Sequence, residues 1–363
     1  MTSVVCDHSG NDKLLFFLDL SKQEQEALFD ELGLPRWRLG QIRRWVFARK
    51  KDSFEQMTDL SKELRRELTS RFATNSDGSL FSGKLITNRI SEDGTIKILT
   101  EFPDGHRVES VLLRDERNHR TACISTQVGC AMGCVFCASG LDGFVRNLTR
   151  GEILEQILRL NMLLPEPERL THLVIMGTGE PMLNRVNLLS ALEDATDTDG
   201  LDLSNRRVTV STVGLPEGIR AMAAANVPYK LAISLHAPND VLRNQIMPSN
   251  RHTGIAQILS AADDYFKRSG RRVTFEYILI DQCNSSQDHA RELVSLLRGR
   301  TAIVNLIPFN PVEELDFRTP SNETVRRFAD ILTRGGVQVK VRFRKGDGID
   351  AACGQLRRSC SKK

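Results

Sequence analysis

The chain has 363 residues, a net charge of +4, and ordinary globular proportions, with 40% hydrophobic and 26% charged residues. These values exclude a disordered, collagenous or coiled-coil chain, and eight cysteines are too few for a disulfide scaffold. No run approaches the ~18 to 20 apolar residues of a membrane helix, and the apolar run at 14–18 is interrupted by Asp19. We therefore expect a cytoplasmic protein with no membrane partner and with reduced thiols.

The first 75 residues predict a helical domain. Apolar residues recur at three- and four-residue steps, typical of helices, in 23–32, 38–49 and 61–72. Between Arg36 and Lys51 there are seven Arg or Lys and no acid, and Trp37, Trp45 and Phe47 lie among them. This stretch fits either a solvated helix face with aromatic core anchors or a surface that follows nucleic-acid phosphates.

Residues 76–120 change character. Asp93-Gly94 and Pro103-Asp104-Gly105 are turn signals between β-rich runs at 95–102 and 107–113. We expect a small antiparallel β extension that joins the helical domain to the main domain.

From residue 121 onward, strand and helix patterns alternate. The strand-like runs are 121–126, 171–176, 207–212, 229–235, 272–280, 301–307 and 337–343. The helix-like runs are 150–164, 186–196, 217–225, 255–267, 287–297 and 322–334. Repeated βα units imply a parallel sheet with crossover helices. We predict an α/β fold with a partial (β/α)6 barrel over 121–345, with an open doubly wound sheet as the alternative, and a C-terminal tail over 346–363. From Lys340 to the end, the sequence contains eight Lys or Arg and only two acidic residues.

The strongest chemical signal is a cysteine motif after the first predicted barrel strand, Cys130-x3-Cys134-x2-Cys137. Three soft thiolates on one short loop suit three irons of a [4Fe-4S] cube and leave the fourth iron open to chelate a small molecule. A structural zinc site usually takes four protein ligands, so we favour the cluster over a zinc knot or three buried thiols.

Residues at the ends of later strands fit the same site, because parallel strands of such barrels end at one edge. They are Gly179, Glu180, Ser211, Ser234, Leu235, His236 and Asn310. Each alone is more often a turn former, a cap or a structural histidine.

Two further cysteines stand out. Cys123 lies seven positions before Cys130, and Cys353 lies in a glycine-bracketed tail segment that suggests a mobile, exposed thiol. The alternatives are a small buried hydrophobe for Cys123 and an inert tail residue for Cys353.

Over nearly its whole length the chain resembles the RlmN/Cfr family of radical S-adenosylmethionine (SAM) RNA adenine methyltransferases. Besides the cysteine motif, the resemblance rests on Arg38-x2-Gln41-Ile42-x2-Trp45, Met57-Thr58-Asp59-Leu60-Ser61-Lys62, Val108-Glu109-Ser110-Val111, Gly179-Glu180-Pro181-Met182-Leu183-Asn184, Ser234-Leu235-His236-Ala237, Asn305-Leu306-Ile307-Pro308-Phe309-Asn310-Pro311 and Ala351-Ala352-Cys353-Gly354-Gln355-Leu356. A tail cysteine paired with one just before the cluster motif is peculiar to this family.

The resemblance implies a [4Fe-4S] cluster on Cys130, Cys134 and Cys137, and SAM used twice per turnover. It makes the strand-end residues named above SAM contacts. It also implies an RNA substrate, 23S ribosomal RNA and possibly transfer RNA, together with an external electron donor. We expect a monomer, with the basic N-terminal domain contacting RNA through cations and stacked aromatics.

The resemblance also implies residue roles. The Cys353 thiolate takes a methyl group from a first SAM, and a second SAM yields the 5′-deoxyadenosyl radical that activates this methyl for addition to adenine. Glu109 is implied as the base that removes the ring proton. Cys123 then attacks the Cys353 sulfur and releases the product. We expect methylation at C2. The alternatives are C8 methylation, as in the Cfr branch, and a non-catalytic iron-sulfur RNA-binding or redox module.

Overall fold

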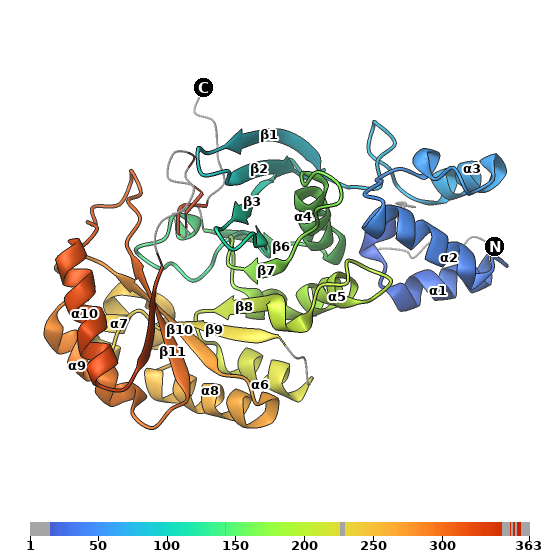
Figure 1. Cartoon of the computed structure of the whole chain (residues 1–363). Coiled ribbons are helices and arrows are strands. Elements are labelled where there is room, and N and C mark those ends of the chain that lie inside the picture. The colour runs from blue at the N-terminus through green and yellow to red at the C-terminus, as the bar shows by residue number, and fades with distance from the viewer. Residues whose placement is uncertain are drawn as a thin grey trace.

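The computed structural model describes residues 15–141, 143–225, 229–342, 349, 351–352 and 354–356. Cys353 lies outside these residues. The head, residues 15–73, is helical as predicted, and it lies at one end of the molecule against α4 and α5 (Figure 1). Its helices are α1 (Lys22–Glu31), α2 (Arg36–Arg43), a π-helical turn (Arg44–Ala48) and α3 (Lys62–Arg71). Ser21 and Ser61 cap α1 and α3 with their side-chain oxygens.

One ten-stranded sheet runs through the rest of the chain, in the order β1-β2-β3-β4-β7-β8-β9-β10-β11-β12. The first three strands, which form the predicted β extension, pair antiparallel and join β4. From β4 to β12 all pairs are parallel. The strands are β1 (Lys84–Ile90), β2 (Ile96–Glu101), β3 (Arg107–Arg114), β4 (Arg120–Cys123), β7 (His172–Ile175), β8 (Val208–Thr212), β9 (Lys230–Ser234), β10 (Val273–Leu279), β11 (Ala302–Pro308) and β12 (Gln338–Val341).

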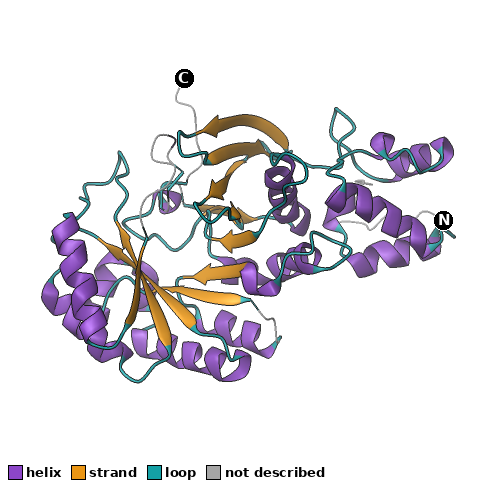
Figure 2. Cartoon of the chain, in the orientation of Figure 1, coloured by secondary structure: helices purple, strands orange, loops and turns teal. Residues whose placement is uncertain are grey.

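Helices connect the parallel strands and cover the outside of the curved sheet (Figure 2). They are α4 (Arg150–Met162), α5 (Arg185–Thr196), α6 (Pro216–Ala224), α7 (Asp240–Ile246), α8 (Ile255–Ser269), α9 (Gln287–Leu297) and α10 (Asn322–Arg334). Within the described residues β1 and β12 remain the two edges, so the barrel is open. The predicted α/β fold with a partial barrel is therefore confirmed. None of the described helices is long and apolar enough to span a membrane.

Three elements were not predicted. Strand β1 is exposed along its whole length, so it lacks the apolar alternation that marks a half-buried strand. Helix α7 has only seven residues, which is too short to show a helical apolar pattern. A two-stranded hairpin, β5 (Gln127–Gly129) with β6 (Phe144–Asn147), carries the cysteine motif in its connecting loop.

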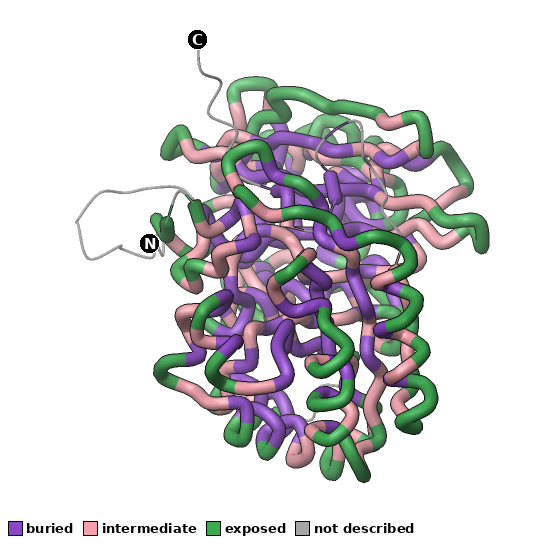
Figure 3. Tube along the Cα trace, turned by 90° about the vertical axis from the view of Figure 1, so that its left-hand side faces the viewer, coloured by how far each residue is buried: buried purple, intermediate pink, exposed green. Residues whose placement is uncertain are grey.

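The head and the barrel share one hydrophobic core, and buried residues run through the interior of the molecule (Figure 3). Inside the head, Phe17 packs edge-on against Phe54 and Phe72, with ring centroids 6.1 and 5.4 Å apart. A buried ion cluster joins the two parts: Asp194 of α5 accepts from Arg43 of the head at 2.7 Å and also pairs with Arg150 of α4. The head is thus fixed to the barrel by packing and by charge.

Candidate active site

The cysteine loop is shaped by the hairpin that carries it. Gly129 begins the loop with φ +73°, and a side chain there would run into the carbonyl oxygen of Gly143. The Cys130 N–H donates to that same carbonyl at 3.0 Å and closes the loop. Phe136 packs with apolar residues of α7 and its surroundings, and the Val135 N–H donates to the Ile246 carbonyl at 3.1 Å.

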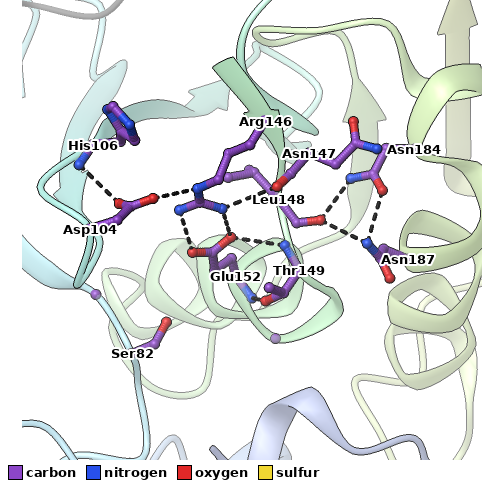
Figure 4. Close-up of polar contacts among 12 residues, drawn as sticks. Ser82, Asp104, His106, Arg146, Asn147, Leu148, Thr149, Glu152, Asn184 and Asn187 are labelled. Carbon is purple, nitrogen blue, oxygen red and sulfur yellow. Dashed lines mark hydrogen bonds and ion pairs between the residues drawn. The ribbon is translucent and has the colours of Figure 1, made fainter. Parts of the chain in front are cut away.

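Polar contacts anchor the second strand of the hairpin (Figure 4). The guanidinium of Arg146 donates to both carboxylate oxygens of Glu152 on α4, at 2.7 and 2.8 Å, and pairs with Asp104 from the β2–β3 turn. Asn184 and Asn187 donate to the Leu148 carbonyl at 2.8 and 3.0 Å. The loop is therefore tied to the turn that follows Glu180.

The three cysteines line one cavity of about 160 Å³, the cluster cavity. Burial raises the pKa of the Cys130 thiol to about 11 and that of Cys134 well above its ordinary value, and the nearby Cys137 raises both further. Buried, mutually repelling thiolates need a positive centre to be stable, and metal coordination supplies one. The donor set therefore fits an iron-sulfur cluster.

Among the described residues, no three His, Cys, Asp or Glu side chains converge on a position for a single metal ion. A cube is held differently, because each thiolate ligates a different iron.

The turn after β7 forms another wall of this cavity. Gly179 has φ +109°, and a Cβ there would lie 2.6 Å from the Cβ of Gln127. Glu180 is buried, and its carboxylate accepts from the Thr212 hydroxyl at 2.7 Å and from the Val213 N–H at 2.8 Å. Burial raises the pKa of Glu180, and these hydrogen bonds oppose the rise. The carboxylate is thus held rigidly at the cavity wall, where it could face a cationic ligand.

His236 enters the cavity from the end of β9. Its Nδ1 accepts from the Ile278 N–H at 3.0 Å, so the neutral ring carries its proton on Nε2. Burial lowers the pKa of His236 to about 3, and its ring packs edge-on against Phe136 at 4.9 Å. The side chain therefore offers a neutral N–H donor.

Eight of the residues predicted from sequence line the cluster cavity together: Cys130, Cys134, Cys137, Gly179, Glu180, Ser211, Ser234 and His236. Two predicted SAM contacts lie elsewhere. Leu235 is fully buried in the main core, and its N–H donates to the Glu276 carbonyl at 3.0 Å. Asn310 lines a neighbouring cavity.

That neighbouring space, the lumen cavity, has a volume of about 690 Å³ and occupies the inside of the barrel. It shares four wall residues with the cluster cavity, which are Met176, Glu276, Ile307 and Arg342. Cys123 lines it, as do Ala351, Ala352 and Leu356 of the tail. Gly354 lines the cluster cavity, and its carbonyl accepts from the Ala138 N–H at 2.8 Å. The described tail residues thus lie along both cavities.

Glu109 lies on β3, two positions from Val111, which pairs with Cys123 of β4. Alternation along a strand places Glu109 and Val111 on the same face, and Val111 packs with Cys123 and tail residues in one buried cluster. The Glu109 carboxylate is buried and pairs with Lys97 at 3.0 Å. It does not line either cavity.

Three charged residues near the site were missed by the sequence reasoning. Glu276 and Arg342 line both cavities, and a glutamate within the apolar run of β10 was an available signal. Arg243 of α7 is buried and donates to the Leu235, Ser234 and Val213 carbonyls at 3.0, 3.0 and 2.6 Å. It fixes the ends of β8 and β9. Burial lowers its pKa to about 10. Only the tertiary fold brings it to these carbonyls.

The basic stretch of the head is largely engaged in structure. Trp45 and Phe47 are buried, whereas Trp37 is 57% exposed and lies under the Arg38 guanidinium at 4.0 Å. Arg43 is buried in the Asp194 ion cluster. The core-anchor reading therefore holds for two of the three aromatics, and Trp37 remains available for a ligand.

Comparison with known proteins places the chain in a family. Residues 16–73 match the ribosomal RNA large subunit methyltransferase N-terminal domain, and residues 124–293 match the radical SAM superfamily. The chain is 53% identical over 342 residues to a "Probable dual-specificity RNA methyltransferase RlmN" of Rhodopirellula baltica, covering 94% of this chain and 90% of the relative. A protein of the same name from Desulforamulus reducens is 45% identical over 356 residues, covering 98% and 99%.

The crystal structure of a radical SAM methyltransferase from Sphaerobacter thermophilus superposes with a TM-score of 0.90 at 40% identity, covering 94% of this chain and 99% of that one. Membership of the superfamily implies a [4Fe-4S] cluster and SAM, and the cavity with three cysteines accords with both. The chain belongs to the RlmN family of radical SAM proteins.

Proposed function

We propose that this protein methylates C2 of adenine in 23S ribosomal RNA and in transfer RNA, through a methyl group carried on Cys353. The relatives' names supply the class of substrate. The observation that carries the rest is the pair of neighbouring cavities with shared wall residues: the cysteine motif lines one, Cys123 lines the other, and tail residues on both sides of Cys353 lie along them.

When bound, the cluster and SAM supply a 5′-deoxyadenosyl radical. Radical chemistry is needed because C2 of adenine is not nucleophilic and cannot attack the methyl group of SAM directly. The protein's part is to bind and orient. Glu180 and the His236 N–H present a fixed acceptor and a fixed donor to SAM. Met176 and Ile307 form apolar walls between the cavities and keep water from the reacting atoms.

The thiols and a carboxylate complete the proposal. Cys353 forms a bond to the methyl carbon as the SAM sulfonium leaves, and later carries the RNA adduct. Glu109, on the face that also holds Cys123, accepts the ring proton. The Cys123 thiolate then forms a disulfide with the Cys353 sulfur, and the bond from that sulfur to the transferred carbon breaks. Its electron pair stays with the carbon, which takes up a proton to become the methyl group, and an external reductant restores both thiols. We further propose that the protein acts in the cytoplasm as a monomer.

Nucleoside mass spectrometry tests the proposal. Protein purified and reconstituted without oxygen should convert adenosine in unmodified RNA to 2-methyladenosine. Formation of 8-methyladenosine would favour the Cfr-like reaction, and no methylated product would favour a non-catalytic module. Cys134→Ser should lose the cluster absorbance and activity. Cys283→Ser, which changes a cysteine outside both cavities, should keep both.

The carrier roles have their own readouts. With labelled SAM, Cys353→Ala should gain no protein-bound methyl group, and labelling of that variant would refute the carrier. Cys123→Ala should trap RNA covalently on the protein, whereas release of free product would show that another thiol resolves the adduct.

A further inference from the structure

Three cationic side chains at different strands line the lumen cavity, and we call them the rim. Arg207 directly precedes β8, Lys230 begins β9, and Lys340 is the third of the four residues of β12. Arg207 and Lys230 lie at the amino ends of neighbouring parallel strands, and the charge of Lys340 acts on Lys230, so three segments far apart in sequence bring these side chains together. All three line the lumen cavity and are exposed.

The rim is not a set of ordinary paired surface charges. Among the described residues, none of the three makes an ion pair with a carboxylate. On the outer helices the pattern differs: Arg291 pairs with Asp288 at 2.5 Å, and Arg327 pairs with Glu323 at 2.6 Å. The pKa of Lys230 is lowered by burial and then by the charges of Lys340, Arg271 and Arg207. Asp115, Glu116 and Glu276 also line the cavity, but in the described part of the chain none of them pairs with the rim. Cations this close to one another repel, and a bound anion would relieve the repulsion.

The cavity behind the rim is the right kind of space for a nucleotide. Its volume of about 690 Å³ falls within the range of about 300–1,000 Å³ typical of ligand pockets. An enzyme that acts on a ring carbon must take the base out of its stack and insert it into a pocket. Cys123 lies inside this cavity. A nucleotide that enters it past the rim would leave its neighbouring phosphates among the three cations.

We propose that Arg207, Lys230 and Lys340 bind the RNA phosphates that flank the nucleotide inserted into the lumen cavity. This inference rests on the proposed function, because it takes RNA as the ligand. It adds an entry side: RNA reaches the barrel at the amino ends of β8 and β9, opposite the edge that carries the cysteine loop.

Salt dependence tests the rim directly. The triple variant Arg207→Gln, Lys230→Gln, Lys340→Gln, reconstituted as holoenzyme, is compared with wild type by fluorescence anisotropy with fluorescein-labelled oligoadenylate. Each phosphate contact contributes about 0.7 to the slope of log K against log salt for single strands, so three contacts lower the slope by about 2. Between about 50 and 200 mM salt, wild-type affinity should fall about 15-fold more than that of the variant.

A matched control removes three arginines from the outer helices, Arg291→Gln, Arg326→Gln, Arg327→Gln. All three are well exposed, and we expect the wild-type slope. In turnover assays the rim variant should raise KM for RNA and leave kcat at saturating RNA unchanged. A single charge reversal, Lys230→Glu, should show the same direction of change if the triple variant folds poorly.

The outcomes separate the rim from the proposed function. If wild type methylates RNA and the rim variant binds oligoadenylate with the wild-type slope, the rim proposal is overturned and the function stands. If wild type neither binds nor methylates RNA, the proposed function fails, and the rim proposal falls with it. If inorganic pyrophosphate stabilises wild type but not the rim variant while RNA affinity is unchanged, the rim is a small-anion site and the proposal is overturned.

Discussion

Replacement of Asp194 by asparagine should destabilise the junction between head and barrel. The Asp194 carboxylate is 2% exposed and pairs with Arg43, which is 1% exposed, and with Arg150, which is 6% exposed. Asparagine keeps the shape but removes the negative charge, which leaves two buried guanidinium groups without a counter-charge. Breaking a buried pair in this way costs about 3–5 kcal/mol.

The cost converts to a measurable shift in melting temperature. For 363 residues, an unfolding entropy of about 2.1 cal/mol/K per residue gives about 0.8 kcal/mol/K, so Tm should fall by about 4–6 °C. Calorimetry measures the shift, and amide hydrogen exchange in α2 should accelerate because the head is released first. Asp288→Asn removes an exposed partner of Arg291 and should leave Tm unchanged. Equal melting of the two variants would refute the importance of the buried cluster.

Further changes test the site and its surroundings. Gly179→Ala should reduce SAM affinity at least about tenfold in calorimetric titration, because φ +109° and the 2.6 Å approach to Gln127 oppose a side chain; wild-type affinity would contradict this. Arg243→Met should cost about 2–4 kcal/mol in urea unfolding, because three buried carbonyls lose their donor, and an unchanged midpoint would contradict that role. Burial, then the charges of His119, Arg207 and Lys230, lowers the pKa of His172 from 6.5 to about 4. Its contribution to stability is therefore full above pH 6.5 and is lost as the pH falls from 6.5 to about 4. Removing the Lys230 charge should raise this pKa in an NMR titration, and a fixed pKa would contradict the proximity of the two groups. Trp37→Ala should weaken RNA binding about tenfold without a change in Tm, because one stacked base is lost. Equal affinity of the variant and wild type would show that Trp37 does not contact RNA.

Local signals were enough for most of the barrel. The predicted helix at 287–297 coincides with α9, because Ser286 caps the first turn and the apolar spacing sets the buried face. The alternating runs located each parallel strand to within a few residues. They failed for β1, whose side chains are all exposed, because its pairing with β2 is made by backbone hydrogen bonds and leaves no apolar pattern.

Residue types and spacing also determined the chemistry of the cysteine motif, because three thiols within eight positions cannot avoid meeting on one loop. The sequence could not show which side chains from different strands lie next to one another. Alternation of neighbouring side chains places Ser234 in the cluster cavity and Leu235 in the core. Asn310, two residues after the end of β11, lines the lumen cavity instead. The same limit applied to Arg43, which looked like a surface cation and is buried against Asp194.

The sequence by itself was enough to locate most strands and helices of the barrel, to predict the cluster ligands and to recognise the family, since each depends on residues that are neighbours along the chain. The tertiary structure alone decided that Arg207, Lys230 and Lys340 line one cavity, and that Cys123 and the described tail residues share it. The physical reason is that the twist and shear of the sheet decide which distant side chains meet, and no local pattern encodes them.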